Sequence, residues 1–294
     1  MKNQTRAYLF ALAAVGCWST VATAFKITLR HLDVWQMLLA SSASAVAVLA
    51  VILAFQGKLR LLKEFHAADY GRSAVAGLLN PFLYYSILLT AYQLLPAQEA
   101  QSLNYTWSIV LVLMSAVFLR QHIRPASYVA VGVSYFGVLV IATHGRPWAL
   151  HFDDWPGVLL AVGSAFIWGG YWILNIRDRR DEVARLFLNF AFGAAYSLVA
   201  ALLFSDPLHL PLAGLAGGAY IGLFEMAIPF AVWLRALNLS ENTARVSNLV
   251  YLSPFLSLVF INFILRETVH AYTLAGLGFI IAGIFLQQWL SHRA

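Results

Sequence analysis

The chain has 294 residues, of which 61% are hydrophobic and only 11% are charged. Soluble domains carry about 25% charged residues, so this composition excludes an ordinary soluble enzyme and indicates a protein whose solvent is lipid. The formal net charge is +6, and the single cysteine, Cys17, has no partner for a disulfide within the chain.

Ten hydrophobic segments follow one another along the chain, each long enough to cross a bilayer. A spanning helix needs about 20 apolar residues, and backbone polar groups in lipid must be satisfied within the segment. The sequence therefore predicts an all-α integral membrane protein with short loops and a single membrane domain. We expect the ten transmembrane helices at 7–29, 34–55, 71–94, 97–119, 125–143, 156–176, 182–204, 213–237, 241–265 and 271–290.

The basic residues are distributed unequally between the two sides of this bundle. Of the 19 Lys and Arg residues, only four lie on the side opposite the N-terminus when the spans are taken in order, namely Lys26, Arg30, Arg146 and Arg266. Cytoplasmic loops carry the excess of Lys and Arg, so we expect both termini in the cytoplasm. The basic excess then requires no nucleic-acid partner.

The first span has some features of a secretory signal peptide. Basic residues precede its apolar run, and an Ala-Thr-Ala sequence at 22–24 resembles a cleavage site. However, the run continues to about Leu29, Trp18 interrupts it, and cleavage would leave nine spans. We therefore expect the segment to be retained as the first transmembrane helix.

The second half of the chain repeats the first. Trp18 is matched by Trp168, 150 residues later. Further identities keep the same order at offsets of 145 or 146 residues: Gly77 with Gly222, Ala91 with Ala236, Leu94 with Leu239, Arg120 with Arg266, Gly132 with Gly278 and Gly137 with Gly283. An odd number of spans in each half gives the halves opposite orientations. We therefore predict two inverted five-helix repeats, 1–146 and 147–294, an arrangement typical of secondary transporters.

A small set of motif residues adds to this pattern. They are Trp18, Trp168, Pro254 and Arg266-Glu267. With them the chain resembles the drug/metabolite transporter superfamily, in its ten-helix form built from two EamA-like repeats, although the first repeat has Ser108 and Gln121 in place of the proline and glutamate. Its aromatic content is most similar to that of the YddG-type exporters of aromatic amino acids. The resemblance implies export of small metabolites by alternating access through a central cavity.

Glu225 is the only carboxylate that we place well inside a span, near the middle of the eighth. A charge at that depth is costly, so such residues usually face a cavity or the bundle interior. The 145-residue offset puts Asn80 at the matching place in the third span, which suggests a shared polar cavity. Two interpretations stay open: Glu225 contacts a substrate amino group or binds a proton, or it is a hydrogen-bonded carboxyl that fixes helix packing.

Many aromatic residues lie within spans rather than at their ends. Interfacial belts explain Trp and Tyr near the headgroups, but not Trp18 or Trp168, about a dozen residues into a helix. A buried Tyr or Trp needs a hydrogen-bond partner, which indicates a polar cavity, although helix packing uses similar residues. The candidate substrate-binding residues are Trp18, Asn80, Tyr84, Gln101, Tyr105, Trp107, Ser108, Trp168, Tyr171, Glu225, Asn248 and Tyr251.

Prolines and glycines mark further positions in the spans. Pro81, Pro229 and Pro254 interrupt the third, eighth and ninth. Proline removes a ladder hydrogen bond, and paired interruptions in two halves point to a transport site, so a gating hinge and a static bend both fit. Four glycines of the fifth and tenth spans are expected to permit close helix contact: Gly132, Gly137, Gly278 and Gly283.

No residue pattern indicates catalysis, a metal site or a cofactor, because the histidines lack ligand spacing and no acid–base pair lies at one depth. We therefore expect a transporter and not an enzyme, functional as a monomer, whose partners are a small-molecule substrate and membrane lipid. With the resemblance, the sequence predicts export of amino acids, including aromatic ones. The alternative is a multidrug exporter of lipophilic cations with Glu225 as counter-ion, and both proton-coupled and uncoupled transport stay open.

Overall fold

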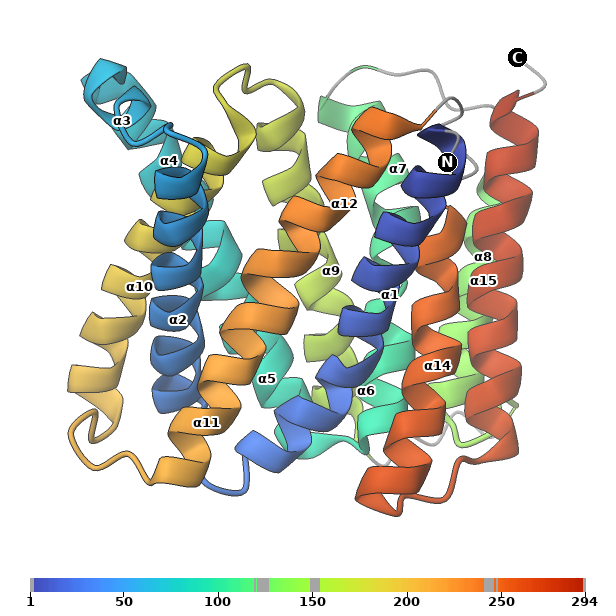
Figure 1. Ribbon diagram of the computed structural model, residues 1–294. Coiled ribbons are helices and arrows are strands. Elements are labelled where there is room, and N and C mark those ends of the chain that lie inside the picture. The colour runs from blue at the N-terminus through green and yellow to red at the C-terminus, as the bar shows by residue number, and fades with distance from the viewer. Residues whose placement is uncertain are drawn as a thin grey trace. The chain divides into compact units, whose positions relative to one another are not determined.

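The computed structural model describes residues 3–118, 120, 127–148, 154–240, 246 and 248–292. Across these ranges the regular structure is entirely helical (Figure 1). Within them, nine helical segments are long and apolar enough to cross a membrane, and a shorter apolar helix covers Tyr128–Ala142. The prediction of an all-α membrane protein with ten hydrophobic spans is confirmed. Gln121 and the first residues of the predicted fifth and ninth spans lie outside the described residues.

The helices are broken more often than ten continuous spans would be. In chain order the segments are α1 (Asn3–Thr28), α2 (Val34–Phe55), α3 (Leu61–Glu64), α4 (Ala67–Gly77), η1 (Leu78–Leu83), α5 (Tyr84–Leu94), α6 (Ala97–Asn104), α7 (Trp107–Phe118), α8 (Ser127–Ala142), α9 (Trp155–Ile176), α10 (Glu182–Phe204), α11 (Leu212–Ile221), η2 (Gly222–Ala227), α12 (Ile228–Leu239), η3 (Asn248–Leu252), α14 (Ser253–Phe260), η4 (Ile261–Leu265) and α15 (Ala271–His292). Of the four η segments, η3 is a 3₁₀-helix and the others are π-helical.

Prolines lie at three of these breaks. In the third span, Asn80 has extended torsion angles (φ −144°, ψ 119°) inside η1, as is favoured for a residue before proline. Pro229 and Pro254 are the second residues of α12 and α14. A helix tolerates proline in its first turn, where the missing N–H has no ladder partner. Pro229 and Pro254 therefore lie where the helix type changes within one continuous span, and movement at these positions stays a prediction.

The contacts divide the chain into two compact units. Unit 1 comprises Met1–Phe82 and Arg179–Leu265, and unit 2 comprises Leu83–Asp178 and Arg266–Ala294. Each unit contains helices from both predicted repeats. The units are therefore packing units and differ from the repeats predicted at 1–146 and 147–294.

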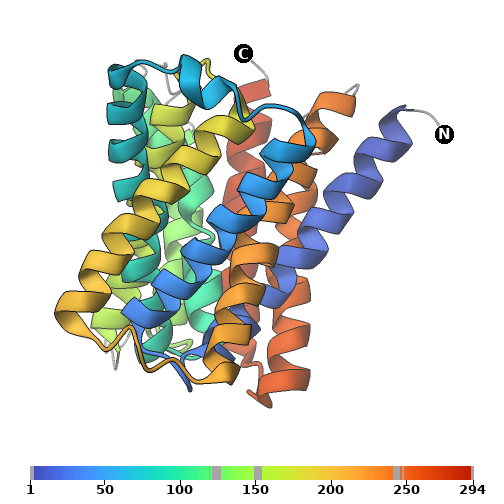
Figure 2. The same cartoon turned by 60° about the vertical axis from the view of Figure 1, so that its left-hand side comes forward.

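In unit 1, α2 and α10 lie side by side along their lengths (Figures 1 and 2). Just beyond the C-terminus of α2, Lys58 Nζ is 2.7 Å from Oδ2 of Asp181, the N-cap of α10. At the other ends, the Ser205 hydroxyl after α10 bonds the carboxylate of Asp33, the N-cap of α2. These two contacts show that α2 and α10 are antiparallel.

Also in unit 1, α1 packs against α11, α12 and α14. Near its N-terminus, Ala7 and Ala11 form a buried cluster with Ala236 near the end of α12. Near its C-terminus, Thr28 lies so close to Gly217 of α11 that a Cβ on this glycine would be 2.2 Å from the threonine Oγ1. Helix α1 is therefore antiparallel to the eighth span, and small residues permit the close contact.

In unit 2, α8 and α15 form a similarly close antiparallel pair. A Cβ added to Gly137 would lie 2.4 Å from the main-chain oxygen of Gly276, and one added to Gly283 would also meet the facing backbone. The predicted close contact is therefore found at these two glycines. The prediction of close contact is wrong for Gly132 and Gly278, where an added Cβ would have nothing within 4 Å.

The remaining helix of unit 2, α9, packs against α5, α6 and α7. Gly157 near its start faces Leu95, which follows the end of α5. Gly169, further along, packs against Met114 of α7. Helix α9 is therefore antiparallel to α5, and its aromatic residues lie alongside the polar residues of α5 and α6.

Candidate functional site

Trp18 lies in α1 of unit 1 and faces the broken eighth span. Its indole N–H donates a hydrogen bond to the main-chain oxygen of Glu225, 3.4 Å away. Its ring packs against Phe230 and Trp233, with ring centroids 5.9 and 5.4 Å apart. Glu225 is half-buried in the π-helical segment η2, and π-helical turns recur at functional sites. We call Trp18, Glu225, Phe230 and Trp233 the Trp18 cluster.

The residues after Trp18 add a polar face to α1. The Thr20 hydroxyl is 2.7 Å from the Tyr220 hydroxyl of α11. The buried Ser19 hydroxyl is 3.5 Å from that of Ser253, the first residue of α14. Helix α1 is thus joined by polar contacts to both broken helices against which it packs in unit 1.

Asn80 lies in the same unit and is fully buried. Neither its amide nitrogen nor its amide oxygen has a hydrogen-bond partner among the described residues. Pro81, which follows it, packs against Gly193 of α10. Asn80 is therefore not hydrogen-bonded to Glu225, and the expected cavity shared by these two residues stays a prediction.

Trp168 lies at the centre of a second group, in unit 2. The Tyr84 hydroxyl donates to Asn104 Oδ1 at 3.2 Å, and the Asn104 amide donates to Ser164 Oγ at 3.0 Å. The Trp168 ring packs on Tyr84 at 4.7 Å and on Tyr171 at 5.8 Å between centroids. These five residues, Tyr84, Asn104, Ser164, Trp168 and Tyr171, form what we call the Trp168 cluster.

A further hydrogen bond joins α5 to α6, and one more ring packs on Trp168. The Tyr92 hydroxyl of α5 donates to Gln101 Oε1 of α6 at 2.6 Å. Trp172 packs on Trp168 at 6.0 Å, and its buried indole N–H lacks a hydrogen-bond partner in the described part of the chain. Tyr92 and Ser164 were missed as candidates because they become polar contacts only once α5, α6 and α9 are packed together.

The other predicted site residues lie elsewhere in the two units. Tyr105 and Ser108 are buried where α6 ends and α7 begins, and Trp107 is half-buried beside them. Asn248 and Tyr251 belong to η3 in unit 1. No hydrogen bond between described residues joins Trp107 or Asn248 to either aromatic cluster. Their role in substrate binding therefore stays a prediction.

Glu99 is a buried carboxylate that the sequence did not single out. It is only 1% exposed, in the first turn of α6. The Tyr272 hydroxyl donates to its Oε1 at 2.9 Å, and His144 Nε2 lies 3.6 Å from the same oxygen. Glu99 therefore adds a buried carboxylate near the border of a span to Glu225, the one predicted well inside a span. No local sequence pattern indicates the burial of Glu99, because His144 and Tyr272 come from remote parts of the chain.

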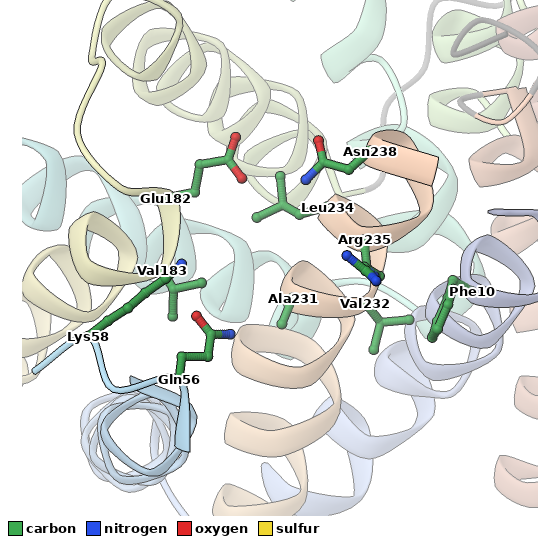
Figure 3. Close-up of a pocket in the computed structure, with 10 residues that line it drawn as sticks. All are labelled: Phe10, Gln56, Lys58, Glu182, Val183, Ala231, Val232, Leu234, Arg235 and Asn238. Atoms are coloured by element: carbon green, nitrogen blue, oxygen red, sulfur yellow. The ribbon is translucent and has the colours of Figure 1, made fainter. Parts of the chain in front are cut away.

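A cavity of about 610 Å³ with a mainly apolar lining and several charged groups lies within unit 1. Figure 3 shows its walls, formed by α1, the end of α2, the start of α10 and the last turns of α12. None of the predicted substrate-binding residues lines it. Its volume is in the range of small-molecule sites. The lining residues are Phe10, Gln56, Lys58, Glu182, Val183, Ala231, Val232, Leu234, Arg235 and Asn238.

The charged groups of this cavity differ in their pairing. Lys58 is bonded to Asp181, whose carboxylate also accepts the N–H groups of Val183 and Ala184. Partial burial opposes ionisation of Asp181, but these hydrogen bonds and the Lys58 charge outweigh it and hold its pKa below the usual value. No ion pair between described residues engages Glu182 or Arg235, so the cavity presents a carboxylate and a guanidinium to a solute.

The described residues contain no group of three His, Cys, Asp or Glu side chains placed to bind a metal ion. The two aromatic clusters instead contain aromatic faces, neutral hydroxyl and amide groups, and few charges. Aromatic faces attract organic cations such as ammonium groups, and hydroxyl and amide groups orient a polar solute by hydrogen bonds.

Comparison with known proteins identifies relatives that are membrane transporters. The model of the EamA-like transporter family matches residues 5–143 and again 155–287. An uncharacterized transporter of Clostridium kluyveri is 23% identical over 98% of this chain and 95% of its own length. The protein named aromatic amino acid exporter YddG of Ancylobacter novellus is 28% identical over 62% of this chain and 64% of its own length. A solved crystal structure with 21% identity superposes with a TM-score of 0.68 over 98% of both chains.

Proposed function

The chain belongs to the EamA-like transporter family, a family of membrane transporters and not of enzymes, and on this premise we propose that it exports amino acids, including aromatic ones, from the cytoplasm. The observation that carries the proposal is the Trp168 cluster. It combines aromatic faces, which suit an ammonium group and an aromatic side chain, with the bonded Tyr84, Asn104 and Ser164. The printed name of the Ancylobacter novellus relative supports this substrate class.

The proposed transport mechanism is alternating access between two inverted repeats, 1–146 and 147–294. Helices α2 and α10 occupy equivalent places in the two repeats and are antiparallel neighbours within unit 1. Helices α8 and α15 are likewise equivalent and antiparallel within unit 2. Opposite directions of equivalent helices are what inverted repeats require, and such repeats place the substrate site where they meet. In this proposal Trp18 and Trp168 are substrate-binding residues, and Pro81, Pro229 and Pro254 act as hinges.

The proposed orientation places both termini in the cytoplasm and the protein in a bacterial inner membrane. It rests on the excess of Lys and Arg on the side of the N-terminus. Lys58 and Arg235 belong to that side, so the unit 1 cavity opens to the cytoplasm in this arrangement. A solute to be exported enters from there. The pairings described above require no second copy of the chain, and a monomer suffices.

The test is counter-flow with the purified full chain in liposomes. Liposomes preloaded with unlabelled phenylalanine, tyrosine or leucine should take up the labelled amino acid faster than protein-free liposomes. Trp168→Ala, which removes the central ring of its cluster, should slow uptake, and Trp148→Ala is the matched control because Trp148 is 86% exposed. Lack of counter-flow with every amino acid would rule out the proposed substrate class.

One observation favours a second candidate function. Glu225 is half-buried and its main-chain oxygen accepts the Trp18 indole N–H, and a carboxylate in an aromatic-rich region also suits a lipophilic cation. Export of such cations is therefore the alternative. Inhibition of labelled phenylalanine counter-flow by tetraphenylphosphonium that disappears in Glu225→Gln would support it, whereas inhibition unchanged in this variant would contradict it.

A further inference from the structure

The buried Glu99 carboxylate has no role in the transport path proposed above. It lies in α6, and its nearest polar partners come from the turn after α8 and from the start of α15. All of these residues belong to unit 2. A carboxylate that is almost completely buried is stable only if it carries a proton or has a positively charged neighbour. Glu99 has a histidine in the position of that neighbour.

We propose that Glu99 is a proton-binding site of this transporter and that its occupancy controls transport. His144 Nε2 lies 3.6 Å from Glu99 Oε1, which is ion-pair distance when the imidazole carries its second proton. The His144 side chain is 35% exposed whereas that of Glu99 is 2% exposed. His144 therefore connects the buried carboxylate to water, as a proton relay requires.

The remaining groups around Glu99 are also polar. The His270 ring stacks on the Tyr272 ring with 5.0 Å between centroids and an interplanar angle of 9°. The centroid of the His144 ring lies 5.2 Å from that of the same Tyr272 ring. Asp154, the N-cap of α9, adds a repulsive charge, whereas His270 adds an attractive one when protonated. Proton binding at Glu99 is therefore sensitive to the charge states of two histidines.

The proton balance is simple. When the His144 imidazolium transfers its proton to Glu99, the products are a neutral imidazole and a neutral carboxylic acid, and the ion pair disappears. The reverse transfer restores the pair and returns the proton to His144, which exchanges it with water. The Tyr272 hydroxyl bonds Glu99 Oε1 in the structure, so one hydrogen bond persists while the charge changes.

Helix α6 links this site to the proposed substrate site. It is only eight residues long and is separated from α7 at Tyr105 and Thr106. Its first turn carries Glu99, and its last turn carries Gln101 and Asn104, which bond Tyr92 and Tyr84. A charge change at Glu99 therefore acts on the same short segment that holds the Trp168 cluster together. This inference rests on the proposed function only for its effect on transport, not for proton binding itself.

Two measurements on the purified full chain test the proposal. Infrared difference spectra recorded during a pH titration should show the carbonyl band of a protonated carboxyl group, and Glu99→Gln should remove that band. Glu267→Gln is the matched control, because Glu267 accepts the Ala97 N–H at the start of the same helix and should leave the band in place. The second measurement is labelled phenylalanine counter-flow in liposomes at equal pH on both sides, repeated across the pH range.

The counter-flow rate of the natural chain should vary with pH, by up to about tenfold per pH unit on one side of the midpoint. The counter-flow rate of Glu99→Gln should not vary with pH. His144→Gln removes the neighbouring positive charge, so the band should persist and appear at higher pH. Tyr272→Phe should also shift the appearance of the band to higher pH. This variant provides the test if Glu99→Gln fails to fold.

The proposal is overturned if Glu99→Gln keeps both the band and the natural pH profile, or if Glu225→Gln removes them instead. Lack of amino-acid counter-flow at every pH, with a titrating band that needs Glu99, would reject the proposed substrate but retain the proton site.

Discussion

The two units hold equivalent aromatic residues by different means. In unit 1, Trp18 donates to a main-chain oxygen at 3.4 Å, at a π-helical turn. In unit 2, Trp168 packs beside a chain of side-chain hydrogen bonds from Tyr84 through Asn104 to Ser164. The first arrangement depends on backbone geometry, and the second depends on the identity of the side chains. Single substitutions should therefore disrupt the Trp168 cluster more readily than the Trp18 cluster.

The helix pairs of the two units differ in a corresponding way. Helices α2 and α10 of unit 1 are joined at their ends by Lys58 with Asp181 and by Asp33 with Ser205. Helices α8 and α15 of unit 2 meet along their lengths at glycines, where backbone approaches backbone. Close packing of this kind tolerates no added atom, whereas exposed ion pairs contribute little. The following changes test this contrast, beginning with the largest expected effect.

Replacement of Asn104 by leucine should give the largest loss of transport. The change removes both hydrogen bonds of Asn104 and leaves the Tyr84 hydroxyl and the Ser164 hydroxyl without this partner. The Ser164 hydroxyl keeps its bond to the main-chain oxygen of Ala161, and an intramolecular hydrogen bond contributes about 0.5–1.5 kcal/mol. Loss of the two bonds that orient the cluster should therefore lower the initial rate of phenylalanine counter-flow by up to about tenfold. Thr90→Val is the control, because the Thr90 hydroxyl donates to the main-chain oxygen of Ser86 within its own helix and outside the cluster. Equal losses in both variants would argue against a special role of the cluster.

Gly137→Ala should destabilise the protein without touching either cluster. The new Cβ would lie 2.4 Å from the main-chain oxygen of Gly276, so α8 and α15 must separate, at a cost of about 1–3 kcal/mol. Gly132→Ala in the same helix meets nothing within 4 Å and should be neutral or stabilising by up to about 1 kcal/mol. Thermal unfolding of the detergent-purified variants measures the difference, and a lower Tm for the Gly132 variant would contradict the close-contact account.

Asp181→Asn should have the smallest effect and a defined pH dependence. The pKa of Asp181 is lowered in the folded protein because its hydrogen bonds and the Lys58 charge outweigh partial burial. A lowered folded pKa stabilises the protein above the unfolded value of about 3.9 and loses this contribution as pH falls through the folded value.

Because Lys58 and Asp181 are 37% and 25% exposed, the contribution should stay below about 1 kcal/mol. The Tm difference between the natural chain and Asp181→Asn should therefore be small near neutral pH and vanish in strong acid. The exposed Glu64→Gln serves as control, and a difference that grows in acid would refute the sign.

The sequence predicted the spans and the class because lipid imposes a simple constraint on composition. Long apolar runs must be helical in a membrane, and nine segments plus a shorter helix follow that rule among the residues described. Interruptions were also visible, since Pro81, Pro229 and Pro254 lie at breaks. The break between α6 and α7 carries no proline or glycine, and nothing local predicts it.

The details of the candidate site were less accessible. Trp18 and Trp168 were recognised because an indole in mid-span is unusual, and both lie at the centre of aromatic groups. Ser164 and Tyr92 acquire their contacts only through helix packing. Glu99 lies two residues from the predicted start of its span, where a carboxylate is usually solvated. Its burial depends on residues 144 and 272, which no periodicity relates to it.

The shortness of α6 has an electrostatic consequence. Eight residues at 1.5 Å each extend about 12 Å, well under half of a hydrocarbon layer about 30 Å thick, so the segment ends inside the span Ala97–Phe118 rather than at its border. The final carbonyl groups of a helix carry about half a negative elementary charge. Helix α7 begins after only two intervening residues of the same span, so its first N–H groups, which carry the opposite partial charge, lie at the same depth. The break beside Asn104 therefore presents both poles of the peptide dipole within the span rather than a net negative charge.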